Sequence, residues 1–326
     1  MSRKGFTIVE LLIVVVVIAI LAAVTVVAYT GISQRSKDAA LKSEVSQALK
    51  AVESAKVTNG TDAYPATLAA INLSSSKLTY YYNSRSNSYC LEGNDDPVVY
   101  SVTNGQTTVR DVPCTEQGVD LWMPLNGSLA DQSSNGYTLT ATGSPVPTTG
   151  AGGGANTACA FDGVDDMLYI DTNTIPSKLD AFTVSVWSRG VGSPNNDYMT
   201  LVHRSLNDSI GSSVIWVGAN PSQVMNISTN GQFGSGVMGI TATTTDWRHT
   251  VMVYAGGYQT GYVDAVQRVD SSIGPVTNNS VTNRFSIGAS RTVGYRDIVG
   301  AVDDVRVYNR ALTLEEIQAL YANGAR

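Results

Sequence analysis

The sequence begins Met1-Ser-Arg-Lys-Gly-Phe-Thr-Ile-Val-Glu10 and continues as an almost unbroken apolar run from Leu11 to Ala28. At a rise of about 1.5 Å per residue, a helix of this length covers most of a hydrocarbon core about 30 Å thick. Arg3 and Lys4 stand just before the run, and positive charge on that side keeps the first residues in the cytoplasm. The segment therefore predicts a single pass through the cytoplasmic membrane, with the rest of the chain outside.

Glu10 is the residue that an ordinary membrane anchor does not explain. A carboxylate among membrane-embedded residues costs a few kcal/mol and needs a partner, for which an α-amino group is the candidate. A cleaved secretory signal does not fit either, because its apolar stretch is only about 7–15 residues and ends in small residues at a cleavage site. Here the run is longer and leads directly into further helical sequence.

The segment Lys4-Gly-Phe-Thr-Ile-Val-Glu-Leu-Leu12 resembles the class III signal of type IV prepilins and pseudopilins. The resemblance implies that residues 1–5 are a leader and that prepilin peptidase cuts between Gly5 and Phe6. It also implies that Phe6 becomes N-methylated and that Glu10 neutralises the Phe6 amine of a neighbouring subunit. Residues 6–28 are then the transmembrane and assembly helix, and the expected partners are the membrane before assembly and other pilin subunits in a helical filament.

The helical pattern extends beyond the membrane. Residues 33–56 contain neither Gly nor Pro, and apolar residues recur there every three or four positions, at Leu41, Val45, Ala48, Leu49, Val52 and Ala55. Asn59-Gly60 is a C-terminal stop signal. The sequence predicts one helix from Phe6 to Thr58, roughly 80 Å long, whose apolar stripe must pack on another element.

Residues 29–115 are expected to form a pilin head. Short strand-like runs at Lys77–Tyr82, Asn87–Glu92 and Val98–Val102 predict a small antiparallel sheet that lies on the helix stripe. Cys90 and Cys114 bracket this sheet. They are either a disulfide, of the kind with which similar pilins close a loop, or two buried free thiols.

Residues 118–326 change to a pattern of many short strands separated by Gly, Asn, Asp, Ser and Pro, which is typical of a two-sheet sandwich. Thr313 and Glu316 form a capping box that begins a terminal helix, and Gly324 ends it. The predicted class is α+β: a long N-terminal helix with a small pilin sheet, then an all-β jelly roll with a short C-terminal helix.

Six strings in this region, in order, resemble laminin G-like and concanavalin A-type lectin and glucanase modules. They are Leu121-Trp-Met-Pro-Leu-Asn-Gly127, Phe161-Asp-Gly-Val-Asp-Asp166, Phe182-Thr-Val-Ser-Val-Trp187, Trp247-Arg-His-Thr-Val-Met-Val-Tyr254, Tyr262-Val-Asp264 and Gly300-Ala-Val-Asp-Asp-Val-Arg-Val-Tyr-Asn-Arg-Ala-Leu312. Such folds include both lectins and hydrolases, so the resemblance alone does not decide the function.

The distribution of acidic residues argues against catalysis. Glucanases of this architecture use two carboxylates about 5–5.5 Å apart, but the only glutamates after Gly118 are Glu315 and Glu316, both in the terminal helix. Asp165/Asp166 and Asp303/Asp304 are adjacent pairs, and adjacent strand residues point to opposite faces. His203 and His249 are expected to be structural, so the sequence predicts a protein that is not an enzyme.

Two kinds of ligand site remain open. The resemblance places a structural Ca²⁺ between Asp131 and Asp303, and the alternative is that Asp131 forms an Asx-turn while Asp303 caps backbone groups. No other cofactor is required. For a carbohydrate ligand, the candidate platforms are Trp187 and Trp216, whose alternative role is core packing.

The charge of the chain limits its partners. The formal net charge is −6, with 21 Lys and Arg against 27 Asp and Glu, and nucleic acid is not expected because phosphate binding needs a basic face. The expected function is a type IV pilus subunit, minor or at the tip, that presents a lectin-like adhesin domain at the cell surface for attachment to a glycan or another surface. The alternative is a pseudopilin of a type II secretion or DNA-uptake machine, whose β-sandwich makes only protein contacts.

Overall fold

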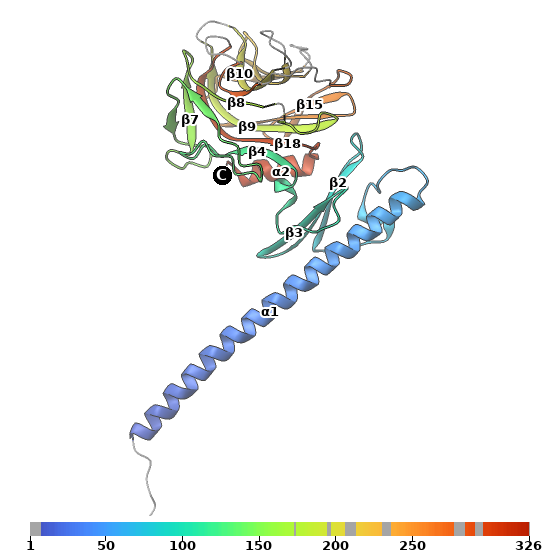
Figure 1. Ribbon diagram of the computed structural model, residues 1–326, viewed down its shortest axis with the longest axis vertical. Helices are drawn as coiled ribbons and strands as arrows, with labels where there is room; N and C mark the ends of the chain where they lie inside the picture. Colours follow the sequence, from blue (N-terminus) through green and yellow to red (C-terminus); the bar gives the residue numbers. More distant parts are fainter. Residues whose placement is uncertain are drawn as a thin grey trace, which may run out of the picture. The chain divides into compact units, whose positions relative to one another are not determined.

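A computed structural model describes residues 8–172, 174–193, 197–205, 213–229, 236–276, 284–290 and 296–325. The chain divides into two compact units. The first comprises the residues up to Tyr80 together with Leu91–Pro113, and the second comprises Tyr81–Cys90 together with the chain from Cys114 onward. The described elements agree with the expected α+β class, in which a long helix and a small sheet precede a β-sandwich (Figure 1).

The first unit is built on helix α1 (Ile8–Thr58), which is 51 residues long as described. Its C-terminal half buries the predicted apolar stripe, and strand β3 (Val98–Thr103) packs against it. Strands β1 (Leu78–Asn83) and β2 (Ser88–Asp95) complete a small antiparallel sheet of order β1-β2-β3, and η1 (Leu68–Ile71) is a short 3₁₀ turn. The buried stripe residues are Leu41, Val45, Ala48, Leu49 and Val52.

Gly93 of β2 shows how closely the sheet approaches the helix. A Cβ atom at this position would overlap the Val45 side chain and lie 3.1 Å from Leu41 Cδ1. Glycine therefore lets the sheet pack directly onto the helix stripe, which the amphipathic pattern had predicted without identifying the contact.

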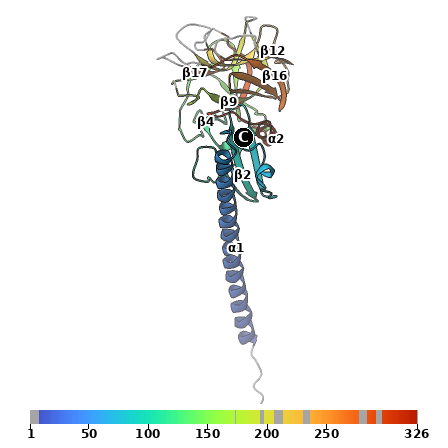
Figure 2. The ribbon, with the colours of Figure 1, turned by 90° about the vertical axis from the view of Figure 1, so that its right-hand side faces the viewer.

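The second unit is a two-layer sandwich. One described sheet has the strand order β13-β12-β11-β10-β17-β8-β5, and the other has the order β16-β15-β14-β9-β18-β7-β6 with β4 paired to β18. Figures 1 and 2 show β8, β10, β12 and β17 in one layer and β9 and β18 in the other. We call these the seven-stranded and the eight-stranded sheet.

The described elements of the sandwich have the following bounds: η2 Cys114–Glu116, β4 Val119–Met123, β5 Thr140–Thr142, β6 Val146–Thr148, β7 Ala158–Asp162, β8 Met167–Asp171, β9 Ala181–Gly192, β10 Met199–Ser205, β11 Ser213–Ala219, β12 Val224–Thr229, β13 Gly236–Thr241, β14 Arg248–Ala255, β15 Tyr258–Val263, β16 Val266–Ser272, β17 Arg284–Ile287, β18 Val299–Tyr308 and α2 Leu314–Asn323.

The apolar core lies between the two sheets and follows the period of two along each strand. On β9, Phe182, Val184 and Val186 are fully buried in this core, and Phe182 stacks on Tyr254 of β14 with ring centroids 5.1 Å apart. Cys159 is a free cysteine that is buried in the same core.

The terminal helix α2 covers part of the outer face of the eight-stranded sheet. Its residues Ile317 and Leu320 join a second apolar cluster with Val251 and Val253 of β14. The predicted capping box is confirmed: the Thr313 hydroxyl accepts the Glu316 N–H, and the Glu316 carboxylate accepts the Thr313 N–H. Gly324 is the C-cap, as predicted.

Candidate functional site

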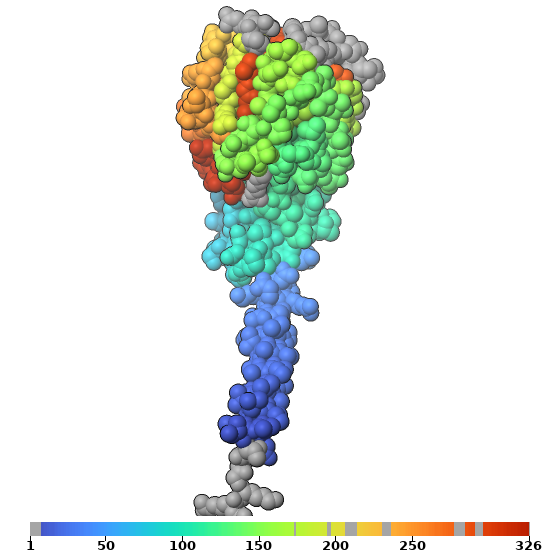
Figure 3. Space-filling view, turned by 90° about the vertical axis from the view of Figure 1, so that its left-hand side faces the viewer, coloured from blue at the N-terminus to red at the C-terminus, as the bar shows by residue number. Residues whose placement is uncertain are grey.

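The N-terminal half of α1 is an uncovered apolar surface. Its most apolar window of 18 residues has a mean hydropathy of 3.4 and no buried residue. The Ile, Leu and Val side chains from Ile8 to Ile32 are between 47% and 84% exposed, and this part of the helix, dark blue in Figure 3, stands clear of the strands of its own unit. Because apolar surface is stabilised by about 25 cal/mol per Å² when it leaves water, this helix requires lipid or other apolar helices around it.

Glu10 lies in the first turn of α1 and is exposed. It is the only ionisable side chain between Ile8 and Tyr29. Its position near the positive end of the helix dipole suits a carboxylate. Gly5 and Phe6 lie outside the described residues, so the cleavage site, the methylation of Phe6 and its pairing with Glu10 stay predictions.

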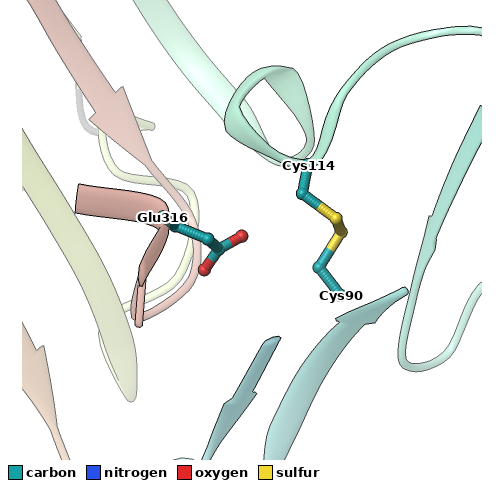
Figure 4. A group of neighbouring side chains, drawn as sticks. All are labelled: Cys90, Cys114 and Glu316. Carbon is teal, nitrogen blue, oxygen red and sulfur yellow. A yellow bond between two sulfur atoms is a disulfide. The ribbon is translucent and has the colours of Figure 1, made fainter. Parts of the chain in front are cut away.

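Cys90 and Cys114 form a disulfide, which decides between the two interpretations of these residues (Figure 4). The Cα atoms are 5.9 Å apart, and the bond closes a separation of 24 residues. The Glu316 carboxylate lies beside the sulfur atoms, and it is ion-paired with Arg310 at 2.8 Å. Bonded sulfurs are not thiolates, so this group is not a metal site.

The structure favours the Asx-turn interpretation for Asp131. Its Oδ1 accepts the N–H groups of Trp122 and Ser133, both at 2.8 Å, and its Oδ2 accepts the Ser133 hydroxyl and the Tyr137 N–H. These four donors occupy the oxygen lone pairs that a Ca²⁺ ligand needs. Asp131 therefore holds a turn in place.

Asp303 is a second buried carboxylate with a backbone role. Its Oδ2 accepts the Ala151 N–H at 2.8 Å, and burial raises its pKa to about 7. Within the described ranges, two groups of acidic or sulfur ligand atoms converge within 4.8 Å, and neither contains Asp131 or Asp303. The hydrogen bonds of Asp131 and Asp303 thus support the alternative in which both carboxylates hold backbone groups, and Ca²⁺ binding stays a prediction.

Asp162, Asp165 and Asp166 form one of these converging groups. Asp166 accepts the Ser144 N–H at 2.7 Å and the Asp162 N–H at 2.9 Å. Backbone donors therefore account for the placement of its carboxylate, and the cluster shapes the turn between β7 and β8.

Trp187 faces outward from the eight-stranded sheet, on the opposite side from the core residues Phe182, Val184 and Val186, but it is only 8% exposed. Its indole stacks on His249 at 4.9 Å and on Tyr321 of α2 at 5.7 Å. The prediction of a glycan platform at Trp187 is wrong because the terminal helix covers this face.

Trp216 likewise faces the outer side of the seven-stranded sheet, but it is 0% exposed. Its Nε1 donates to Thr200 Oγ1 at 2.9 Å, and the Tyr198 ring stands edge-on to it at 5.7 Å. An open platform at Trp216 is therefore also a wrong prediction, because the indole is enclosed.

The sequence analysis missed a row of side chains that crosses the outer face of the seven-stranded sheet. Each member lies directly opposite the next on the neighbouring strand. We call it the cross-strand row, and it consists of Thr140, Tyr169, Ser286, His203, Trp216 and Ser228. Thr140 is exposed, Tyr169 is half-buried beneath the Arg284 guanidinium at 4.0 Å, and the other four are buried.

A serine–histidine contact was also missed. Ser185 Oγ and His249 Nε2 are 2.8 Å apart on the outer face of the eight-stranded sheet. Burial and the neighbouring Arg306 charge lower the pKa of His249 to about 3. Both residues are at most 2% exposed, and Tyr321 of α2 stacks over the imidazole, so the pair holds the helix against the sheet.

Comparison with protein-family models identifies both parts of the chain. Residues 1–26 match the prokaryotic N-terminal methylation motif, and residues 162–318 match the concanavalin A-like lectin/glucanases superfamily model. No curated protein sequence matches the chain.

Solved structures similar to the chain share low sequence identity with it. Domain 4 of AbnA, a GH43 extracellular arabinanase from Geobacillus stearothermophilus solved with arabinotriose, is 16% identical with a TM-score of 0.48, over 62% of this chain and 97% of that domain. The binding domain of Paraclostridial Mosquitocidal Protein 1 is 15% identical with a TM-score of 0.46, over 64% of this chain and 53% of that one. The binding domain of botulinum neurotoxin DC in complex with SialylT is 13% identical with a TM-score of 0.48, over 64% of this chain and 51% of that one. The chain therefore spans about half the length of the two toxin domains.

The methylation motif implies processing by prepilin peptidase and assembly with other pilins. The apolar N-terminal helix fits a membrane-anchored subunit whose C-terminal part is exposed. The chain therefore joins the N-terminal methylation motif of pilins and pseudopilins to a concanavalin A-like β-sandwich.

Proposed function

We propose that this chain is a minor or tip subunit of a type IV pilus and that its β-sandwich is an adhesin that attaches to a glycan. The observation that carries the proposal is the joining, in one chain, of a bare apolar helix with a methylation motif to a lectin-type sandwich. A sandwich of some 200 residues on every subunit would crowd a filament, which supports a minor or terminal position.

The proposed mechanism begins in the cytoplasmic membrane. Cleavage after Gly5 creates the Phe6 amine, and the helix then leaves the bilayer by exchanging lipid contacts for contacts with other apolar helices. Glu10 supplies the single negative charge that pairs with the amine of the neighbouring subunit. The sandwich remains outside throughout and reaches the cell surface with the growing filament.

A pseudopilin of a secretion or DNA-uptake machine is the second candidate. The burial of Trp187 and Trp216 favours it, because neither indole is presented to a sugar in this conformation. In that case the sandwich would bind only other proteins. The proposed role is binding in both cases and includes no catalysis.

A screen of the full-length protein in detergent micelles on a glycan array separates the two candidates. The adhesin proposal predicts saturable binding to a defined set of glycans, together with loss of cell attachment when the gene is deleted. Absence of glycan binding, with loss of secretion or DNA uptake in the deletion strain, would leave the pseudopilin.

A further inference from the structure

A cavity lies on the outer face of the eight-stranded sheet, beside the first turn of α2. Its volume is about 310 Å³, at the lower end of the range of about 300–1,000 Å³ that is usual for ligand pockets. β14 and β15 form its floor, and its walls are β16, the start of α2 and the tip of the β1–β2 hairpin, which belongs to the second unit. The lining includes Tyr82, Arg85, Val253, Tyr262, Asp270 and Glu315.

Tyr262 of β15 lines this cavity with a hydroxyl that the protein leaves unused. The residue is only 9% exposed, and no described residue forms a hydrogen bond with its hydroxyl. Burial raises the pKa of this hydroxyl, the Arg85 charge opposes the rise, and the charges of Asp270 and Glu315 add to it. The phenol is therefore protonated at neutral pH, and it can both donate to a ligand and accept from one.

Arg85, at the tip of the hairpin, does not leave a free positive charge in the cavity. Its Nη1 donates to Asp270 Oδ1 at 2.6 Å and to Thr260 Oγ1 at 3.0 Å, and its Nη2 pairs with the other oxygen of the same carboxylate. The guanidinium also lies 4.5 Å from the centre of the Tyr258 ring. Because a two-pronged pair of this kind fixes and neutralises the guanidinium, Arg85 is part of the wall and is not offered to an anion.

Glu315 supplies the charge that remains. It is the second residue of α2, it is exposed, and it lines the cavity. Within the described ranges, Glu315 belongs to none of the ion pairs, whereas its neighbour Glu316 is paired with Arg310. The charged groups of the lining therefore leave one net negative charge, which favours a cation as the ligand.

We propose that this cavity binds a lysine side chain of a partner protein. The lysine ammonium group has three donors and no acceptor, so it can donate to the Glu315 carboxylate and to the Tyr262 oxygen. Its four-carbon stem can pack on Val253 and on the Tyr82 and Tyr262 rings, because long basic side chains bury their stems on apolar surface and aromatic rings attract cations.

Lysine fits this cavity better than arginine does. A guanidinium is best held by a planar pair of acceptors, whereas an ammonium group is a compact point charge. The planar pair in this cavity is the Asp270 carboxylate, and Arg85 already occupies it. The inference goes beyond the proposed function, because it does not require the sandwich to bind a glycan.

The test measures peptide binding to the full-length protein in detergent micelles by isothermal titration calorimetry. The probe is the peptide acetyl-Gly-Lys-Gly-amide. The control peptide carries norleucine in place of lysine, which keeps the four-carbon stem and lacks the charge. The lysine peptide should bind at least tenfold more tightly than the norleucine peptide, a difference of about 1.4 kcal/mol.

Two variants each remove one polar partner at nearly constant volume. Glu315→Gln and Tyr262→Phe should each weaken binding of the lysine peptide at least fivefold. Tyr262→Phe should keep the melting temperature, because the hydroxyl has no protein partner to lose. The matched controls are Asp246→Asn and Tyr321→Phe, two exposed residues that do not line the cavity, and both should bind the peptide as the wild-type protein does.

Every other outcome overturns the site. Equal binding of the two peptides by the wild-type protein, or no binding of either, removes the lysine assignment. Unchanged affinity in Glu315→Gln or in Tyr262→Phe places the binding elsewhere, and a lower melting temperature of Tyr262→Phe with unchanged affinity assigns its hydroxyl a structural role. Binding of the polyamine spermidine without binding of the lysine peptide assigns the cavity to a small cation. None of these results alters the glycan-array result, so the adhesin proposal is tested separately.

Discussion

His249 should make the β-sandwich sensitive to acid, and the size of the effect follows from its surroundings. The imidazole is buried between Ser185, Trp187 and Tyr321, and burial, with the Arg306 charge, lowers its pKa to about 3. In the unfolded chain the pKa is about 6.5. Between these values the unfolded state binds a proton that the native state does not bind. The stability from the neutral imidazole is therefore nearly complete at pH 7.5 and is lost as the pH falls through 6.5 toward 3, by about 1.4 kcal/mol per unit below pH 6.5, or about 2.7 kcal/mol in all from pH 7.5 to 4.5.

The assay is urea unfolding of the full-length protein in micelles at pH 7.5, 6.5, 5.5 and 4.5. Tryptophan fluorescence reports the transition, and Trp187 is in direct contact with the titrating ring. His249→Gln keeps a side chain that can hydrogen-bond to Ser185 but cannot titrate. Between pH 7.5 and 4.5, the free energy of unfolding of the wild-type protein should therefore fall by about 2.7 kcal/mol more than that of the variant. Parallel pH profiles for the two proteins would refute the assignment of the acid sensitivity to His249.

Three further changes have defined outcomes. Replacing Cys90 and Cys114 with Ser removes a crosslink between residues 24 positions apart and should lower the free energy of unfolding of the second unit by about 3.4 kcal/mol. Equal urea midpoints for the wild-type protein and this variant would contradict the prediction. In Gly218→Ala the new Cβ overlaps the Met199 carbonyl oxygen, so thermal unfolding should show a free energy of unfolding lower by about 1–3 kcal/mol. In the control Gly192→Ala the new Cβ meets no atom within 4 Å, and the decrease should be much smaller. Glu10→Leu should block filament assembly in sheared-pilus blots without blocking processing, and normal filaments from this variant would count against amine pairing.

The sequence predicted the parts of the fold that depend on local patterns. The apolar run and the spacing of Leu41, Val45 and Val52 are enough to define a helix and its buried stripe. The capping box at Thr313 and Glu316 is equally local, since both hydrogen bonds join residues three positions apart. Such signals are complete within a few residues, so they require no knowledge of the rest of the chain.

The candidate site could not be predicted in the same way. Trp187 and Trp216 do lie on outer faces of the sheets, but the alternation of residues along a strand does not tell what covers a face. Trp187 is covered by Tyr321, which lies far along the chain in the terminal helix. Whether a side chain is exposed depends on contacts between distant parts of the chain, and this is why both platform predictions were wrong.

Strands β12 and β13 carry sequence signals of different strength. β13 contains Gly236 and Gly239, and glycine is infrequent in strands. β12 does alternate, with Met225 and Ile227 on one face and Asn226 and Ser228 on the other. That alternation is the period of two that a strand with one face toward the core requires.

The central claim is that this chain is processed after its leader and polymerises through its N-terminal helix. Mass spectrometry of the N-terminal peptide from surface filaments tests it most directly. The account predicts a mature protein that begins with N-methylated Phe6 and retains Glu10 in the same peptide. A chain that still begins at Met1, or one released by cleavage beyond residue 28, would contradict it.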